Sequence, residues 1–143
     1  MRVEVLNGVN LDVLGRRDPA LYGGLSLDEL ETRIYQWARD LGCTVRCRQT
    51  NHEGEYIGWC HDLYEGVDGA IVNAAAWTHY AWSIRDALEP APVPIVEVHL
   101  SNIDEREEWR RHSVLEGLTA LRIVGKGPEG YREALRFLAG ERR

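Results

Sequence analysis

The sequence of 143 residues is poor in several residue types that particular chemistries require. Its three cysteines, Cys43, Cys47 and Cys60, are an odd number without a CxxC pair, which argues against a disulfide framework or a zinc knuckle. We therefore expect buried thiols. The single lysine, Lys126, lies between two glycines. It is interpreted as a loop residue, which argues against a mechanism that needs an imine-forming lysine in an apolar pocket.

Long apolar runs and a concentrated basic face are also missing. No apolar run approaches the roughly 20 residues of a membrane helix, and residues 1–6 are too short and too charged for a signal peptide, so we expect a cytoplasmic protein. The net charge of -6 argues against nonspecific binding to nucleic acid. Arg106, Arg110 and Arg111 do cluster, but glutamates are interleaved with them. This segment is interpreted as a solvated helix face, in which a single arginine could still have a role.

Common motifs for nucleotide and metal binding are absent from the sequence. There is no GxGxxG pattern or P-loop, and no HxxxH, HExxH or clustered carboxylate spacing. The sequence therefore does not predict a metal centre. A flavodoxin-like module that binds a mononucleotide or flavin without catalysis stays open as an alternative, although the loop after the first strand offers arginine and tyrosine instead of phosphate-binding glycines.

The hydrophobic pattern predicts an α/β protein. With 44% hydrophobic and 28% charged residues, the chain has a globular composition, and residues 1–143 fit one domain. Short β-branched runs alternate with amphipathic stretches, which is typical of βαβ units, and five strands with four main helices favour a flavodoxin-like doubly wound parallel sheet. The strands are expected at residues 2–6, 44–49, 69–73, 95–99 and 120–124.

Capping residues and glycines give the helix boundaries. Ser26 and Glu29 form a capping box, and Gly42 ends the apolar helical pattern that follows it. Thr78 is expected to be the N-cap of a helix that runs to Leu88. Two further helices are expected at about 54–64 and 129–139.

Polar residues follow four of the five predicted strands. Each alone is an ordinary turn or cap residue. The carboxyl ends of parallel strands meet at one edge of a doubly wound sheet, so together these residues predict a shared polar pocket. They are Asn7, Asn10, Asn51, His52, Asn73, His79, His99, Ser101 and Asn102.

Two further features point to this edge. The glycine-bounded segment 15–24 is longer than a tight βα turn requires and is interpreted as a lid that brings Arg17 and Tyr22 over the strand ends; the alternative is a surface loop with a packed tyrosine. Glu97 and His99 are two residues apart on one strand and point to the same side, which suits an acid and its supporting neighbour. A structural histidine is the alternative.

Several motifs, in order and spacing, resemble those of the type II 3-dehydroquinate dehydratase family. The resemblance runs from Val5 to Tyr131, over nearly the whole chain. The motifs are Leu-Asn-Gly-Val-Asn-Leu at 6–11, Leu-Gly-Arg-Arg-Asp-Pro at 14–19 with Tyr-Gly at 22–23, Gln-Thr-Asn-His-Glu-Gly at 49–54, Ile-Arg-Asp-Ala at 84–87, Val-Glu-Val-His-Leu-Ser-Asn at 96–102 and the segment 106–113.

The resemblance implies a flavodoxin-like fold and an anti elimination of water from 3-dehydroquinate, through an enolate, to give 3-dehydroshikimate. It implies no cofactor, metal or imine. Tyr22 matches the proton acceptor, Arg17 the lid arginine, His99 the proton donor and Asn10 an asparagine beside the reacting centre. The substrate-binding positions are matched by Asn73, His79, Asp86, Leu100 through its backbone, Ser101 and Arg110. The resemblance also implies a homododecamer, a tetramer of trimers, with no nucleic-acid or membrane partner.

These roles agree with the chemistry. A proton beside a ketone is weakly acidic, so the reaction needs a strong base and a group that stabilises the enolate. Tyr22 can be that base only as tyrosinate, a form that the guanidinium of Arg17 favours. His99 can protonate the hydroxyl, which is a poor leaving group as hydroxide. His61, in the second helix, is expected to be silent in catalysis.

The sequence departs from the family pattern at a few positions. Val9 replaces a proline, Asp18 replaces a glutamate, and Asp104 stands where histidine is frequent, which bears on either subunit contacts or the rim of the site. The segment 74–77 differs in what is expected to line the substrate site, so a homologue with another cyclic hydroxy-acid substrate stays open. The sequence leaves a biosynthetic role, in making aromatic amino acids, and quinate breakdown equally open.

Overall fold

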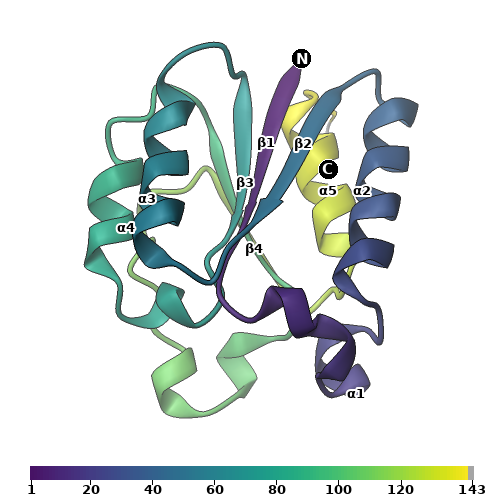
Figure 1. Cartoon of the computed structure of the whole chain (residues 1–143), viewed down its shortest axis with the longest axis vertical. Helices are drawn as coiled ribbons and strands as arrows, with labels where there is room; N and C mark the ends of the chain where they lie inside the picture. The colour runs from purple at the N-terminus through teal and green to yellow at the C-terminus, as the bar shows by residue number, and fades with distance from the viewer. Residues whose placement is uncertain (142–143) are drawn as a thin grey trace.

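The computed structural model describes residues 1–141, and in it five parallel strands form one sheet between two layers of helices (Figure 1). The strand order β2-β1-β3-β4-β5 confirms the predicted flavodoxin-like doubly wound class. Each strand begins and ends within one residue of its predicted bounds. The strands are β1 Arg2–Asn7, β2 Thr44–Gln49, β3 Gly69–Asn73, β4 Ile95–His99 and β5 Leu121–Val124.

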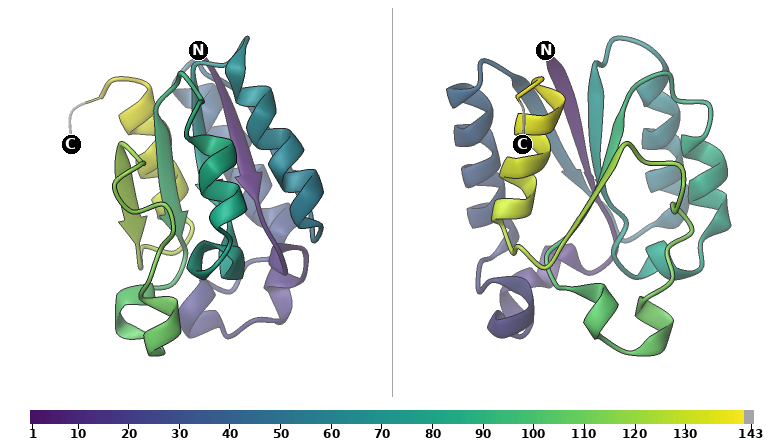
Figure 2. Two further views of the ribbon diagram at one scale, coloured as in Figure 1. Left: turned by 90° about the vertical axis from the view of Figure 1, so that its left-hand side faces the viewer. Right: turned by 180° about the vertical axis from the view of Figure 1, so that it is seen from behind.

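Two helices cover each face of the sheet (Figures 1 and 2). Helices α2 (Leu27–Asp40) and α5 (Glu129–Leu138) pack on one face, and α3 (Glu53–His61) and α4 (Trp82–Leu88) pack on the other. A short helix α1 (Pro19–Tyr22) precedes α2. The 3-10 helices are η1 Leu11–Arg16, η2 Asp62–Tyr64, η3 Ala75–His79, η4 Ile103–Glu105 and η5 Glu108–Arg110. Within residues 1–141, none of the helices is long and apolar enough to span a membrane.

The core follows from the sequence pattern. Strands β3 and β4 are buried along their whole length because helices cover both of their faces. The predicted capping box is present at the start of α2, where Ser26 Oγ accepts from the Glu29 N–H at 3.1 Å and Glu29 Oε1 accepts from the Ser26 N–H at 3.2 Å. Two backbone donors of the first turn are thereby satisfied.

Two predicted helical features are wrong. Thr78 is not an N-cap: it lies inside η3, and its hydroxyl is buried without a hydrogen-bond partner among the described residues. The backbone of Tyr80, at φ −153°, interrupts the helical path, and α4 begins only at Trp82. The segment 105–111 is not one solvated helix but parts of two 3-10 turns, with Arg106 extended between them at φ −102° and ψ −165°.

The cysteines are only partly as predicted. All three are free thiols, and Cys60 is buried whereas Cys43 and Cys47 are half-buried. Burial raises the pKa of the Cys47 and Cys60 thiols to about 12 in each case.

The carboxyl ends of the strands meet at one edge of the sheet, the lower edge in Figure 1. The chain segment that contains α1 and the segment around η4 and η5, far apart in sequence, both lie at that edge in all three views (Figures 1 and 2). The predicted lid therefore faces the turns that follow β4.

Gly8 allows two of the loops at this edge to approach closely. Its N–H donates to the Asn73 carbonyl at 2.8 Å. A Cβ at this position would lie 2.6 Å from the Ala74 carbonyl oxygen, a distance that real Cβ contacts do not reach. Because Gly8 has no side chain, the turn after β3 can lie directly against it.

We predict that Gly8→Ala destabilises the protein by about 1–3 kcal/mol, because the new methyl group meets rigid backbone and the turn must move. Gly58→Ala is the matched control: it lies inside α3 with nothing within 4 Å of its added Cβ. The control should gain about 0.5–1 kcal/mol from helix propensity. Urea denaturation measures both, and equal stability of the two variants would contradict the close approach.

Candidate active site

A cavity of about 100 Å³ lies at the carboxyl edge of the sheet, under α1 and the turns after β4. Most of the residues expected at the site line it. These are Asn10, Arg17, Tyr22, Asn73, His79, His99, Leu100, Ser101 and Arg110. Two residues of the segment 74–77, Ala75 and Ala76, also line it as expected, and the structure adds Val9, Leu11, Ile103 and Arg106.

The phenol oxygen of Tyr22 receives two hydrogen bonds from guanidinium groups. Arg17 Nη2 and Arg106 Nη1 each donate to it at 2.5 Å. The Arg17 guanidinium also lies 4.1 Å from the centre of the Tyr22 ring. Tyr22 is only 9% exposed, so these charges act where water screens them little. The phenol oxygen therefore lies between two cationic donors.

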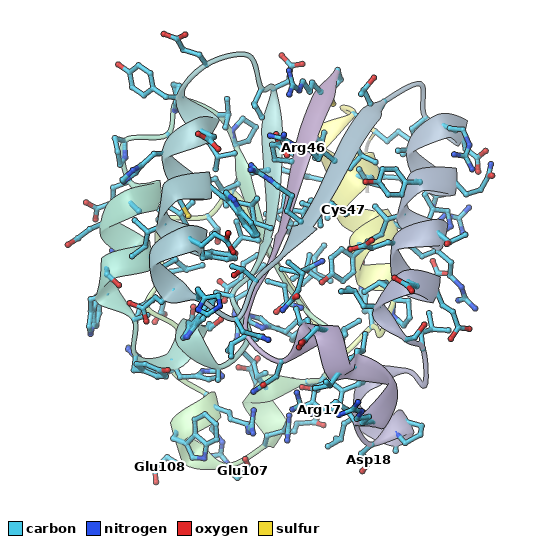
Figure 3. The ribbon with its side chains drawn as sticks, in the orientation of Figure 1. Arg17, Asp18, Arg46, Cys47, Glu107 and Glu108 are labelled. Atoms are coloured by element: carbon cyan, nitrogen blue, oxygen red, sulfur yellow. The ribbon has the colours of Figure 1, made fainter. Side chains whose placement is uncertain are left out.

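The short helix α1 fixes Tyr22 in this position. The Asp18 carboxylate caps the helix by accepting from the Ala20 N–H at 3.0 Å, and Pro19 supplies the first helical residue. Gly23 ends the helix at φ 90°, directly after Tyr22. The shorter acid at position 18 therefore has a structural role. Figure 3 shows Arg17 and Asp18 side by side at this edge of the molecule.

His99 is held from behind by a buried carboxylate. Glu97, which has no exposed surface, accepts from His99 Nε2 at 2.7 Å and from Ser113 Oγ at 2.8 Å. Burial alone would raise the pKa of Glu97, but the hydrogen bonds from His99 and Ser113 outweigh it and hold that pKa below its usual value. The ionised carboxylate keeps a proton of His99 on Nε2 and fixes the orientation of the ring, which leaves Nδ1 without a bond to Glu97.

His79 is arranged differently from its neighbour. Its Nδ1 lies 2.7 Å from the carbonyl oxygen of His112, so Nδ1 carries the proton and donates it. Burial lowers the pKa of His79, and the charge of nearby His99 adds to the effect. A neutral His79 presents a lone pair on Nε2, which can accept a hydrogen bond from a hydroxyl group.

Asn10 lines the cavity from a left-handed turn, at φ 68°. Its N–H donates to Asn51 Oδ1 at 2.8 Å, and Asn51 Nδ2 donates to the Asp12 carboxylate at 2.9 Å. Gln49 Nε2 donates to the Gly8 carbonyl at 3.1 Å in the same turn. The predicted polar residue Asn51 thus supports Asn10 and does not itself line the cavity.

Other predicted residues are not brought to the cavity. Asp86 is exposed on α4, and His52 is exposed at the start of α3. Asn102 caps η4 by accepting from the Asp104 N–H. Asp104 forms a two-pronged ion pair with Arg122 at 2.9 and 3.1 Å, and the Arg122 guanidinium lowers the pKa of that carboxyl. The ion-pair partner of Asp104 is therefore a residue of the same chain.

Arg106 lines the cavity and binds the Tyr22 oxygen, which the sequence did not predict. The charged segment was interpreted as solvated, yet the side chains of Arg106 and Arg110 are only 13% and 19% exposed. Figure 3 shows Glu107 and Glu108 at the outer end of the segment, away from the sheet. Arg106 and Arg110 thus face the cavity, and Glu107 and Glu108 face the solvent. The signals in the sequence were the closeness of the segment to the end of β4 and its place among the motifs that resemble the family.

Ala75 lines the cavity in an uncommon backbone conformation. Its φ is 54°, in the left-handed region that favours glycine. It lies in the segment where the sequence departs from the family pattern. Its methyl group therefore brings both backbone strain and extra volume to the wall of the cavity.

The architecture is that of an α/β protein of the doubly wound class with a polar cavity at the carboxyl ends of its strands. The family model for class II dehydroquinase matches residues 1–139. A 3-dehydroquinate dehydratase of Syntrophotalea carbinolica is 50% identical over 135 residues, 94% of this chain and 91% of the relative. The type II dehydroquinase structure from Propionibacterium acnes has a TM-score of 0.94 and 43% identity, and covers 98% of this chain and 97% of that one. The chain belongs to the class II dehydroquinase family and is a hydro-lyase.

We predict that Ala75→Gly does not lower stability and raises it by up to about 1 kcal/mol. Relief of the left-handed strain, about 1–2 kcal/mol, offsets the entropy that glycine adds to the unfolded chain, about 0.4–1 kcal/mol. Ala76→Gly is the control, because Ala76 is a neighbouring cavity residue without a positive φ. It should lose about 0.5–1 kcal/mol. Equal losses in thermal or urea denaturation would rule out strain at Ala75.

Proposed function

We propose that this protein is a 3-dehydroquinate dehydratase that removes water by anti elimination through an enolate, giving 3-dehydroshikimate. Membership of the class II dehydroquinase family supports the reaction. The two hydrogen bonds from guanidinium groups to the Tyr22 oxygen support the proposed mechanism, because they favour the tyrosinate that proton abstraction needs.

In the first step, the Tyr22 oxygen takes the proton from the carbon beside the ketone. The electron pair of the broken C–H bond moves into the ring, and negative charge develops on the ketone oxygen. Asn10, or a water that it binds, donates a hydrogen bond to this enolate oxygen. Arg17 and Arg106 stay beside the phenol as its charge is neutralised.

In the second step, His99 protonates the departing hydroxyl group from Nδ1. The enolate charge returns to re-form the ketone as the C–O bond breaks, and water leaves. Glu97 keeps its negative charge throughout and stabilises the imidazolium form of His99 through Nε2. His99 thus acts as the acid, and Glu97 acts through it.

The remaining polar groups bind the substrate. His79 accepts from a ring hydroxyl through Nε2, Ser101 and the backbone of Leu100 lie beside His99 in the wall, and Asn73 contributes its side-chain amide. Arg110 has its Nε paired with Glu107 at 2.5 Å, and its terminal nitrogens are left for the substrate carboxylate. No metal or other cofactor takes part in the proposed reaction.

We also propose a homododecamer built from trimers, with a cytoplasmic location. Exposed aromatic side chains at the start of α4, Tyr80 at 60% and Trp82 at 56%, suit subunit contacts. Asp86 on the same helix does not line its own chain's cavity, so a substrate-binding role requires a neighbouring copy. Sedimentation of the purified chain measures this assembly.

We predict a rise in ultraviolet absorbance, from the conjugated product, when purified protein is mixed with 3-dehydroquinate. The rate should be unchanged after treatment with borohydride or with a chelator, because the proposed mechanism uses neither an imine nor a metal. Loss of activity with borohydride would contradict the mechanism. No signal from folded protein would instead favour another cyclic hydroxy-acid as the substrate.

Tyr22→Phe and His99→Ala should each lower kcat by a factor of about 10²–10⁴, the usual range for general acid–base groups, while the protein stays folded. Tyr35→Phe and His61→Ala are the controls, since both residues lie on helices away from the cavity. The controls should keep near wild-type turnover of 3-dehydroquinate. Unchanged turnover in Tyr22→Phe would overturn the assignment of the base.

A further inference from the structure

Tyr131 on α5 is a fully buried tyrosine that the proposed reaction does not use. Its hydroxyl donates to Asn7 Oδ1 at 2.7 Å and accepts from Asn73 Nδ2 at 3.0 Å. Asn73 Oδ1 in turn accepts from the Ala75 N–H at 3.1 Å. A continuous chain of three hydrogen bonds therefore runs from Ala75 at the cavity wall through Asn73 and Tyr131 to Asn7, the residue of β1 that pairs with Asn73 of β3.

The direction of this chain is fixed at one end. The backbone N–H of Ala75 can only donate, so the group of Asn73 that faces it must be the carbonyl oxygen. The NH₂ group of Asn73 is then directed toward Tyr131, whose oxygen accepts, and the one phenol proton goes to Asn7 Oδ1. Reversing the Asn73 amide would bring two donors together at the Ala75 N–H, and reversing the Asn7 amide would take away the acceptor of the phenol proton. Asn7 Nδ2 has no partner in residues 1–141, so Asn7 contributes through its oxygen.

We infer that Tyr131 and Asn7 are positioning residues that set the orientation of the Asn73 amide in the wall of the cavity. Asn73 is 3% exposed and lines that cavity. With one N–H and one lone pair engaged inside the protein, the amide offers the substrate one N–H and one lone pair in a fixed arrangement. The inference rests on the proposed function, because it names what holds a substrate-binding group.

The buried phenol suits this task because it stays neutral. Burial raises the pKa of Tyr131 well above its usual value, so its proton remains available to Asn7 across the working pH range. Removal of the hydroxyl leaves Asn7 Oδ1 and Asn73 Nδ2 without partners in the interior. The Asn73 amide then loses its inner anchor and can rotate away from its binding orientation.

Tyr56 provides a matched control within the same chain. It is also fully buried, and its hydroxyl donates to the Leu6 carbonyl at 2.8 Å. It has no hydrogen bond to Asn73 and does not line the cavity. Tyr56→Phe therefore removes one buried hydroxyl and one hydrogen bond, as a purely structural change, without touching the chain of hydrogen bonds that orients Asn73.

The first test compares the two variants in steady-state kinetics with 3-dehydroquinate. Tyr131→Phe should raise KM about tenfold with kcat within about threefold of wild type, the pattern of a lost binding interaction. Its pH profile should match that of wild type, since the base and the acid are untouched. Tyr56→Phe should leave KM within about twofold. Equal KM values for the two variants would overturn the inference.

A double-mutant cycle separates positioning from general loosening of the core. In an Asn73→Ala background, Tyr131→Phe should raise KM no further, because the group that it orients is gone. Additive effects of the two substitutions on KM would mean that Tyr131 acts by another route, which also overturns the inference. Wild-type turnover in the same assay tests the proposed function separately.

A readout without substrate keeps the inference testable if wild-type protein does not convert 3-dehydroquinate. The side-chain NH₂ protons of Asn73, followed by NMR, should exchange slowly with solvent in wild type and in Tyr56→Phe, because Nδ2 is hydrogen-bonded inside the protein. In Tyr131→Phe the exchange should be at least about tenfold faster. Unchanged exchange in Tyr131→Phe would show that the phenol does not hold the amide.

Discussion

The hydrogen bonds that Arg17 and Arg106 donate to the Tyr22 oxygen join the end of η1, the end of α1 and the link between η4 and η5. Tyr22 belongs to a one-turn helix that could not persist alone, and Arg106 to an extended link between two 3-10 turns. The two guanidinium groups also repel each other, and the lone pairs of the phenol oxygen between them offset this repulsion. The interaction thus holds the segment that contains α1 against the turns after β4.

The sheet below the cavity buries polar side chains at positions where apolar side chains would leave no unsatisfied hydrogen-bonding groups. Asn7 and Glu97 have no exposed surface, and each leaves one polar atom without a partner among the described residues. Unsatisfied buried groups of this kind cost about 1–3 kcal/mol each. Both residues stand directly behind groups of the cavity wall, Asn73 and His99. The two buried residues thus lower the stability of the fold and at the same time orient polar groups of the cavity wall.

The sheet could be predicted from the sequence because strand burial and helix capping are local patterns: the capping box of Ser26 and the apolar run of β3 need no knowledge of distant contacts. Arg106 could not. Its role depends on a tyrosine 84 residues away, and its neighbours in sequence are those of a solvated segment. The positive φ of Ala75 was equally hidden, because alanine gives no local signal for a left-handed turn. The prediction of Thr78 as an N-cap was wrong because threonine is a common capping residue, whereas the break in the helix at Tyr80 has no signal in the local sequence.

The charge of the chain also has to be understood locally. The net charge is -6, yet three arginines, Arg17, Arg106 and Arg110, line the cavity and no aspartate or glutamate in residues 1–141 does. Glu97 lies behind His99 and accepts a hydrogen bond from it. Glu107 accepts one from the Nε of Arg110 on the solvent side of that arginine. Exposed acids far from the cavity are screened by salt within about 10 Å, whereas the enclosed guanidinium groups are screened much less. The positive field is therefore confined to the cavity, where the proposed reaction needs it both for an anionic substrate and for the charge on the proposed base, Tyr22.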